Sequence, residues 1–150
     1  MKKFISLPAA ILCFLAVASA QDKPNFSGTW IVVTPVEHAG QEETITHDAT
    51  SVRVAHGAQG GHHASVYKLD GTPSRNTLTL HGVEIVSVAT ASWKESQLVI
   101  QQSTQYPDGK KVESRLTFAL NSEGQLVREI TDTVGGKVAS TITVVARKKQ

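Results

Sequence analysis

The sequence predicts an all-β fold, a single antiparallel up-and-down barrel of about 8–10 strands. Two features of the 150-residue chain lead to this prediction. Short runs rich in Val, Ile and Thr recur, each ended by Gly, Asp or Asn, and no window of about a dozen residues carries an apolar stripe at helical spacing. A sheet of so many consecutive strands must protect the unpaired backbone groups of its edge strands. Closure into a barrel does so, and a two-sheet sandwich is the alternative.

The N-terminal segment has the three parts of a secretory signal peptide. Lys2 and Lys3 form a basic start, and residues 4–17 are almost uninterrupted apolar sequence. Ala18-Ser19-Ala20 offers the small residues of a cleavage site. The apolar run is too short to span a bilayer, which takes about 20 apolar residues, so we expect no membrane span in the mature chain. We therefore expect a periplasmic or secreted protein with a cleaved signal peptide over 1–20, a lead-in over 21–28 and a barrel domain over 29–150.

The first half of the expected barrel consists of shorter β-branched runs. We predict strands over 30–34, 43–47, 51–56, 65–69 and 76–80. The residues between the fourth and fifth runs, Asp70-Gly71-Thr72-Pro73, are typical of a turn because Gly and Pro set its backbone angles.

The second half is expected to be a meander of strands about ten residues long. We predict strands over 83–93, 98–106, 111–120, 125–133 and 138–147. Three glycine-containing turns divide the later strands: Asp108-Gly109, Ser122-Glu123-Gly124 and Gly135-Gly136. Glycine suits tight hairpins because it accepts a positive φ freely.

Strand alternation places several polar side chains on the inner face of this meander. Gln102 and Tyr106 share a face with apolar Leu98 and Ile100, and Ser114 shares one with Leu116 and Phe118. A dry core does not tolerate unpaired polar groups. We therefore name Arg128, Gln102, Ser114 and Tyr106 as candidate ligand-binding residues.

Arg128 is the most informative of these candidates, because it alternates with Leu126 and Ile130. A buried cation requires a counter-ion, which Glu84, Glu113 or a ligand carboxylate could supply. The alternative is that Val127 faces inward and Arg128 is a solvated residue at the rim.

The two ends of the expected barrel resemble the calycin superfamily, which holds the lipocalins and fatty-acid-binding proteins. Asn25-Phe26-Ser27-Gly28-Thr29-Trp30 is similar to its opening Gly-x-Trp strand, and Val144-Val145-Ala146-Arg147-Lys148 is similar to its last strand. The segment from Trp93 to Leu98 resembles a hairpin of bacterial lipocalin-like domains. The resemblance implies a lipocalin-like barrel with a ligand inside. It also implies a structural signature of Gly28, Trp30 and Arg147, in which the arginine packs across the indole.

The chain departs from fatty-acid-binding proteins in two places. Only residues 35–43 lie between the first two strands, too few for the helix pair of that family. Arg147 is followed by Lys148 and Lys149, so the Arg-x-Tyr pair that holds a fatty-acid carboxylate is incomplete. The resemblance therefore supports the fold and does not extend to fatty-acid binding.

Charge and residue chemistry argue against several other functions. Loss of Lys2 and Lys3 leaves 13 of the 15 basic residues against 13 acidic ones, so we expect no nucleic-acid partner. The single cysteine, Cys13, lies in the expected signal peptide, and no Gly-x-Ser-x-Gly elbow is present. We therefore name no catalytic residue and expect no cofactor. His56, His62 and His63 flank a glycine-rich stretch and are the candidates for a metal site, with simple exposure as the alternative.

These features predict an exported protein that binds a small apolar or amphipathic molecule inside the barrel. One alternative is a periplasmic protein-interaction or inhibitor module with a filled core. A second is metal-dependent activity at the 56–63 loop. An interior cavity of about 300 Å³ or more favours the binding protein.

Overall fold

The computed structural model describes residues 23–57 and 63–150. The expected signal peptide and the metal candidate His62 lie outside the described residues. Ten strands and one short 3-10 helix make up the described elements. They are β1 (Gly28–Thr34), η1 (Val36–His38), β2 (Glu42–His47), β3 (Ser51–His56), β4 (His63–Lys68), β5 (Ser74–Leu80), β6 (Val83–Lys94), β7 (Gln97–Gln105), β8 (Lys111–Leu120), β9 (Leu126–Val134) and β10 (Lys137–Lys148).

All ten predicted strands are present, and β3 and β8 have the predicted bounds. The largest differences are at the starts of β1, β4 and β5, which each begin two residues earlier than predicted, at Gly28, His63 and Ser74. The all-β prediction is confirmed.

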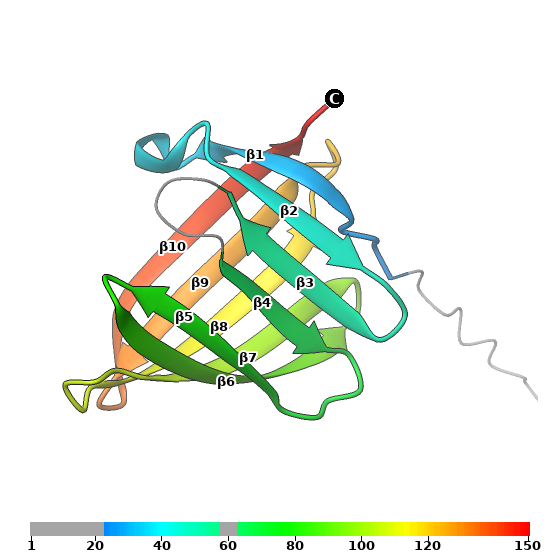
Figure 1. The fold of residues 1–150 in the computed structure, drawn as a ribbon. Helices are drawn as coiled ribbons and strands as arrows, with labels where there is room; N and C mark the ends of the chain where they lie inside the picture. The colour runs from blue at the N-terminus through cyan, green and yellow to red at the C-terminus, as the bar shows by residue number, and fades with distance from the viewer. Residues whose placement is uncertain (1–22, 58–62) are drawn as a thin grey trace, which may run out of the picture.

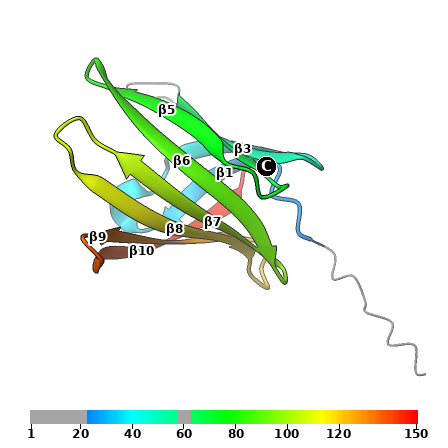
Figure 2. The same ribbon diagram turned by 90° about the horizontal axis from the view of Figure 1, so that it is seen from below.

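The strands form one antiparallel sheet in the order β4-β3-β2-β1-β10-β9-β8-β7-β6-β5. Apart from the β1–β10 pair, every neighbour in this sheet is also a neighbour in sequence, which is the up-and-down arrangement. Figure 1 shows β10 lying beside β1, and the register of this pair joins Trp30 to Lys148. Figures 1 and 2 show the sheet curving around a common interior. The ten strands therefore form one rolled sheet, which is a nearly closed barrel. The alternative, a sandwich of two sheets, is wrong.

The seam between the two edge strands, β4 and β5, is joined by side chains. The amide oxygen of Asn76 accepts a hydrogen bond from the Val66 N–H at 2.8 Å, and its amide nitrogen donates to the Val66 carbonyl at 3.1 Å. The Ser74 hydroxyl accepts from the Lys68 N–H at 3.0 Å. Ser74 and Asn76 are buried. These two residues thus satisfy backbone groups that an ordinary strand ladder would satisfy.

The basic residue that packs against Trp30 is Lys148, so the predicted role of Arg147 is wrong. The Lys148 ammonium lies 5.8 Å from the centre of the indole. Trp30 pairs with Lys148 and therefore shares its face of the sheet, whereas Arg147 is opposite Ile31 and points to the other face. Gly28 allows this packing, because a Cβ there would lie 2.6 Å from the Lys148 Cε.

Candidate functional site

Bulky apolar side chains fill one end of the barrel interior. This is the end where β1 begins and β10 finishes, and its most deeply buried large residues include Phe26, Trp30, Leu98, Phe118 and Leu126. The Trp30 Nε1–H donates to the Phe26 carbonyl at 2.8 Å, which satisfies the indole's polar atom. We call this cluster of buried apolar residues the apolar floor. Beyond it, toward η1 and the start of β4, the inner face carries charged and polar side chains.

A buried ion pair between Arg128 and Glu43 lies directly above the floor. The Arg128 Nη1 and the Glu43 Oε2 are 2.9 Å apart, and the two side chains are 9% and 2% exposed. The guanidinium carbon lies 5.8 Å from the centre of the Phe118 ring. Arg128 therefore points inward, as strand alternation predicted. The pair crosses the interior, since β2 and β9 are separated in the sheet by β1 and β10.

Two polar atoms of this ion pair are buried without a hydrogen-bond partner among the described residues. They are the Glu43 Oε1, which can accept, and the Arg128 Nε–H, which can donate. A buried polar atom left unpaired costs about 1–3 kcal/mol, so buried side chains are usually satisfied. An unpaired acceptor and an unpaired donor in one ion pair therefore mark a site where a ligand could bind.

His56 lies next to the carboxylate of Glu43. Its Nδ1 is 3.6 Å from the Glu43 Oε2, and its ring is 4.9 Å from that of His63 on β4. Burial, with help from the Arg128 charge and His63, lowers the pKa of His56 to about 4. Burial raises the pKa of Glu43 above its usual 4.5, although Arg128 acts in the opposite direction. At neutral pH His56 is therefore uncharged, and the charged partner of the Glu43 carboxyl in this site is the Arg128 guanidinium, 2.9 Å away.

These two pKa shifts have opposite effects on stability. Between pH 6.5 and about 4 the unfolded chain binds more protons at His56 than the folded chain does, so stability falls as the pH falls. The raised pKa of Glu43 means that the folded chain binds more protons there, so its contribution to stability rises as the pH falls.

A cavity of about 230 Å³ adjoins the ion pair. One wall is apolar and is made by Val32, Ile130, Ile142 and Val144. The polar lining comprises His38, Gln41, Glu42, Glu43, His56, Gly57 and Arg128. An apolar wall with a few polar groups is the usual lining of a small-molecule site. This volume is smaller than the ~300 Å³ or more that a ligand-binding barrel is expected to enclose, so the support for binding comes from the chemistry of the lining and not from the size of the cavity.

A second cavity, of about 170 Å³, lies farther around the interior, against β4 to β7. Two predicted ligand-binding residues, Gln102 and Tyr106, line it together with His63. Gln102 also accepts a hydrogen bond from the Tyr67 hydroxyl at 3.5 Å and donates one to Thr104 at 3.2 Å. Its amide is thus partly satisfied within the protein, and none of the described residues that line this cavity is a charged side chain with a buried unpaired atom.

Ser114 and the expected partners of Arg128 lie elsewhere. The Ser114 hydroxyl donates to Asp132 at 2.7 Å, and Ser114 lines neither of these two cavities. Glu84 and Glu113, the two expected counter-ions, are exposed, and Glu113 pairs with Lys111. The structure therefore corrects the counter-ion to Glu43. Alternation with Ile45 along β2 is the sequence signal that could have found it.

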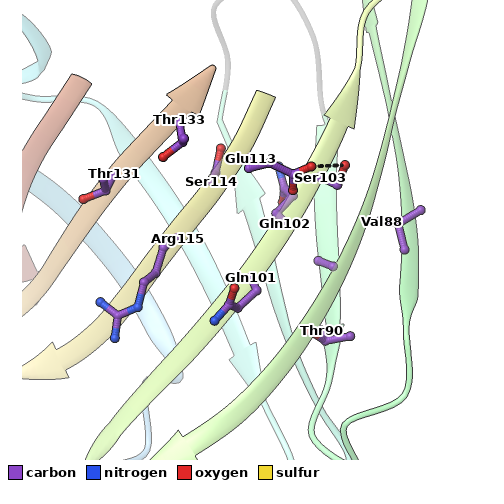
Figure 3. Close-up of a pocket in the computed structure, with 11 residues that line it drawn as sticks. Val88, Thr90, Gln101, Gln102, Ser103, Glu113, Ser114, Arg115, Thr131 and Thr133 are labelled. Carbon is purple, nitrogen blue, oxygen red and sulfur yellow. Dashed lines mark hydrogen bonds between the residues drawn. The ribbon is translucent and has the colours of Figure 1, made fainter. Parts of the chain in front are cut away.

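The outer face of β6 to β9 carries a larger depression, of about 350 Å³ (Figure 3). Figure 3 shows Gln101, Arg115 and Thr131 on neighbouring strands, and the Ser103 hydroxyl donating to Glu113 at 3.3 Å. These side chains alternate with the buried residues of their strands and lie toward solvent. Water can satisfy such groups, so the outer depression has no feature comparable to the unpaired atoms of the interior site.

Two further results concern metals and membranes. Within residues 23–57 and 63–150, no group of three or more His, Cys, Asp or Glu side chains is arranged to hold a metal ion. His56 and His63 are close together, and the third candidate, His62, is outside this part of the chain. No helix in the same two ranges is long and apolar enough to cross a membrane.

No protein-family model matches the chain, and no curated protein matches it. The nearly closed antiparallel barrel is compatible with a calycin-like fold. The function is therefore inferred from the geometry of the interior site.

Proposed function

We propose that the protein is an exported binding protein that holds a small apolar or amphipathic molecule in the barrel, in the cavity beside Glu43 and Arg128. The observation that carries the proposal is the buried Glu43–Arg128 ion pair, which holds an unpaired acceptor and an unpaired donor and whose two residues line a partly apolar cavity. A ligand with an apolar body and one polar group would cover the wall and satisfy a buried atom.

The size of the cavity limits how much of the ligand it can enclose. The cavity is small, with a volume of about 230 Å³, and it is partly open to solvent. We therefore expect the apolar part of the ligand to lie against Val32, Ile130, Ile142 and Val144, while the rest can extend from the open side of the cavity toward solvent.

The proposal includes a calycin-like origin for the fold and a periplasmic or secreted location. Support for the first comes from Gly28, Trp30 and a basic residue of the last strand meeting at the apolar end of the barrel. Support for the second comes from the basic, apolar and small-residue segments at the start of the sequence.

Native mass spectrometry of the protein purified from its own source, followed by titration with the neutral fluorescent probe N-phenyl-1-naphthylamine, tests this function. We expect a co-purified small molecule, or saturable probe binding that Ile142→Trp abolishes by filling the cavity. Thr141→Trp is the matched control, because Thr141 is the neighbouring residue on the opposite face of β10. Absence of both a co-purified molecule and probe binding, or equal binding by the two variants, would contradict the proposal.

A further inference from the structure

The charge balance of the interior site bears on which polar group a ligand can carry. The sequence predicts that a carboxylate of Glu84, Glu113 or a ligand neutralises Arg128. In the structure Glu43 already supplies that carboxylate, at 2.9 Å. At the rim, Glu42 is likewise neutralised by Lys149, whose Nζ lies 2.8 Å from its Oε1.

A charged ligand would therefore gain little from this site. A second carboxylate would approach both Arg128 and Glu43, so attraction to one is opposed by repulsion from the other. An ammonium group meets the same two charges with the signs reversed. Either ion would lose its hydration on entry without a net opposite charge to compensate it. His56 adds no charge at neutral pH, because its pKa is lowered to about 4.

The unpaired atoms instead match a neutral polar group. The Glu43 Oε1 requires a donor and the Arg128 Nε–H requires an acceptor. A hydroxyl group can donate and accept, and a primary amide has both kinds of atom. Both side chains are more than nine-tenths buried, so water competes little for these positions.

We infer that the interior site selects a small amphipathic molecule with a neutral hydroxyl or amide head group, and discriminates against carboxylates and amines of the same length. This inference rests on the proposed function, because it assigns the ligand class of the same cavity. Glu43 is then the specificity-determining residue, since its charge cancels that of Arg128.

Three ligands with the same eight-carbon chain test the inference: 1-octanol, octanoate and octylammonium. Each is titrated at pH 7.5 against the wild-type protein loaded with N-phenyl-1-naphthylamine, and displacement gives its Kd. We expect octanol to bind at least tenfold more tightly than either ion. Tighter binding of octanoate or octylammonium than of octanol by the wild type would overturn the inference.

Two charge-removing variants make the test sharper. Glu43→Gln leaves the Arg128 charge uncompensated, so octanoate should become the preferred ligand by at least tenfold. Arg128→Gln leaves the Glu43 charge, so octylammonium should become preferred instead. Glu113→Gln is the matched control, because Glu113 is on the outer face and exposed, and the wild-type preference should persist. Urea unfolding curves identify the variants that fold, and either one alone suffices for the test.

The outcomes separate the inference from the function on which it depends. If the probe and octanol bind but neither folded variant changes its preference, the head-group inference is wrong and the binding function stands. If neither the probe nor any of the three ligands binds to the wild type, the proposed function fails and the inference fails with it.

Discussion

The buried ion pair between Arg128 and Glu43 should make the barrel less stable than a pair of apolar residues of the same volume would. Removing one partner of a buried pair leaves an uncompensated charge and typically costs about 3–5 kcal/mol. Replacing both partners by apolar residues of similar volume is typically neutral or stabilising by about 1–4 kcal/mol. The unpaired Glu43 Oε1 and Arg128 Nε favour the stabilising end of this range, because both unpaired atoms disappear in the double replacement.

We therefore predict that Arg128→Met alone lowers the free energy of unfolding by about 3–5 kcal/mol. The double variant Glu43→Leu/Arg128→Met should be at least as stable as the wild type. Urea unfolding followed by tryptophan fluorescence measures both, because Trp30 is buried in the apolar floor. With a urea slope of about 2 kcal/mol/M, the single variant's midpoint should fall by roughly 2 M.

The same double variant should lose octanol binding. If the double variant keeps its stability and loses octanol binding, the two charges are needed for ligand binding and not for folding. A double variant that is as unstable as the single variant would refute this reasoning, because the pair would then be a structural requirement of the barrel.

Three further predictions test other parts of the structure. Lys148→Ala should lower stability by about 0.5–1 kcal/mol through loss of its indole contact, whereas Arg147→Ala should stay within about 0.5 kcal/mol of the wild type in the same urea assay. Asn76→Ala should cost about 1–3 kcal/mol, because it leaves seam backbone groups of β4 unpaired; the outward-facing Thr77→Ala is its control, and equal losses would contradict the assigned seam. His56→Gln should reduce the fall in stability between pH 6.5 and about 4, and an unchanged pH profile would contradict the lowered pKa of His56.

Local patterns in the sequence were sufficient to predict the positions of the strands. The hairpin at Asp108-Gly109 depends on four or five consecutive residues, and the runs on either side alternate in a way that only a strand allows. The same alternation left two orientations open for Arg128, and the structure shows that the inward one is correct. The seam between β4 and β5 could not be predicted from such local patterns. It depends on hydrogen bonds from the Ser74 and Asn76 side chains to the backbone of β4, which strand propensities do not describe.

The partner of Arg128 could not be predicted in the same way. Glu43 and Arg128 meet across the interior of a closed sheet, so their pairing depends on how far the strands are staggered around the barrel. At the last strand, the resemblance suggested Arg147. The alternation of Lys148 with the buried Val144 and Ala146 is the sequence signal that could have identified the correct residue.

The side-chain NMR signal of the Arg128 Nε–H offers the most direct measurement of whether the interior site binds a ligand. The Arg128→Lys variant lacks this N–H and so assigns the signal. On titration with 1-octanol, we predict a saturable shift of this resonance as the unpaired donor gains an acceptor. A resonance that stays in place while octanol binds elsewhere, or while nothing binds, would contradict it.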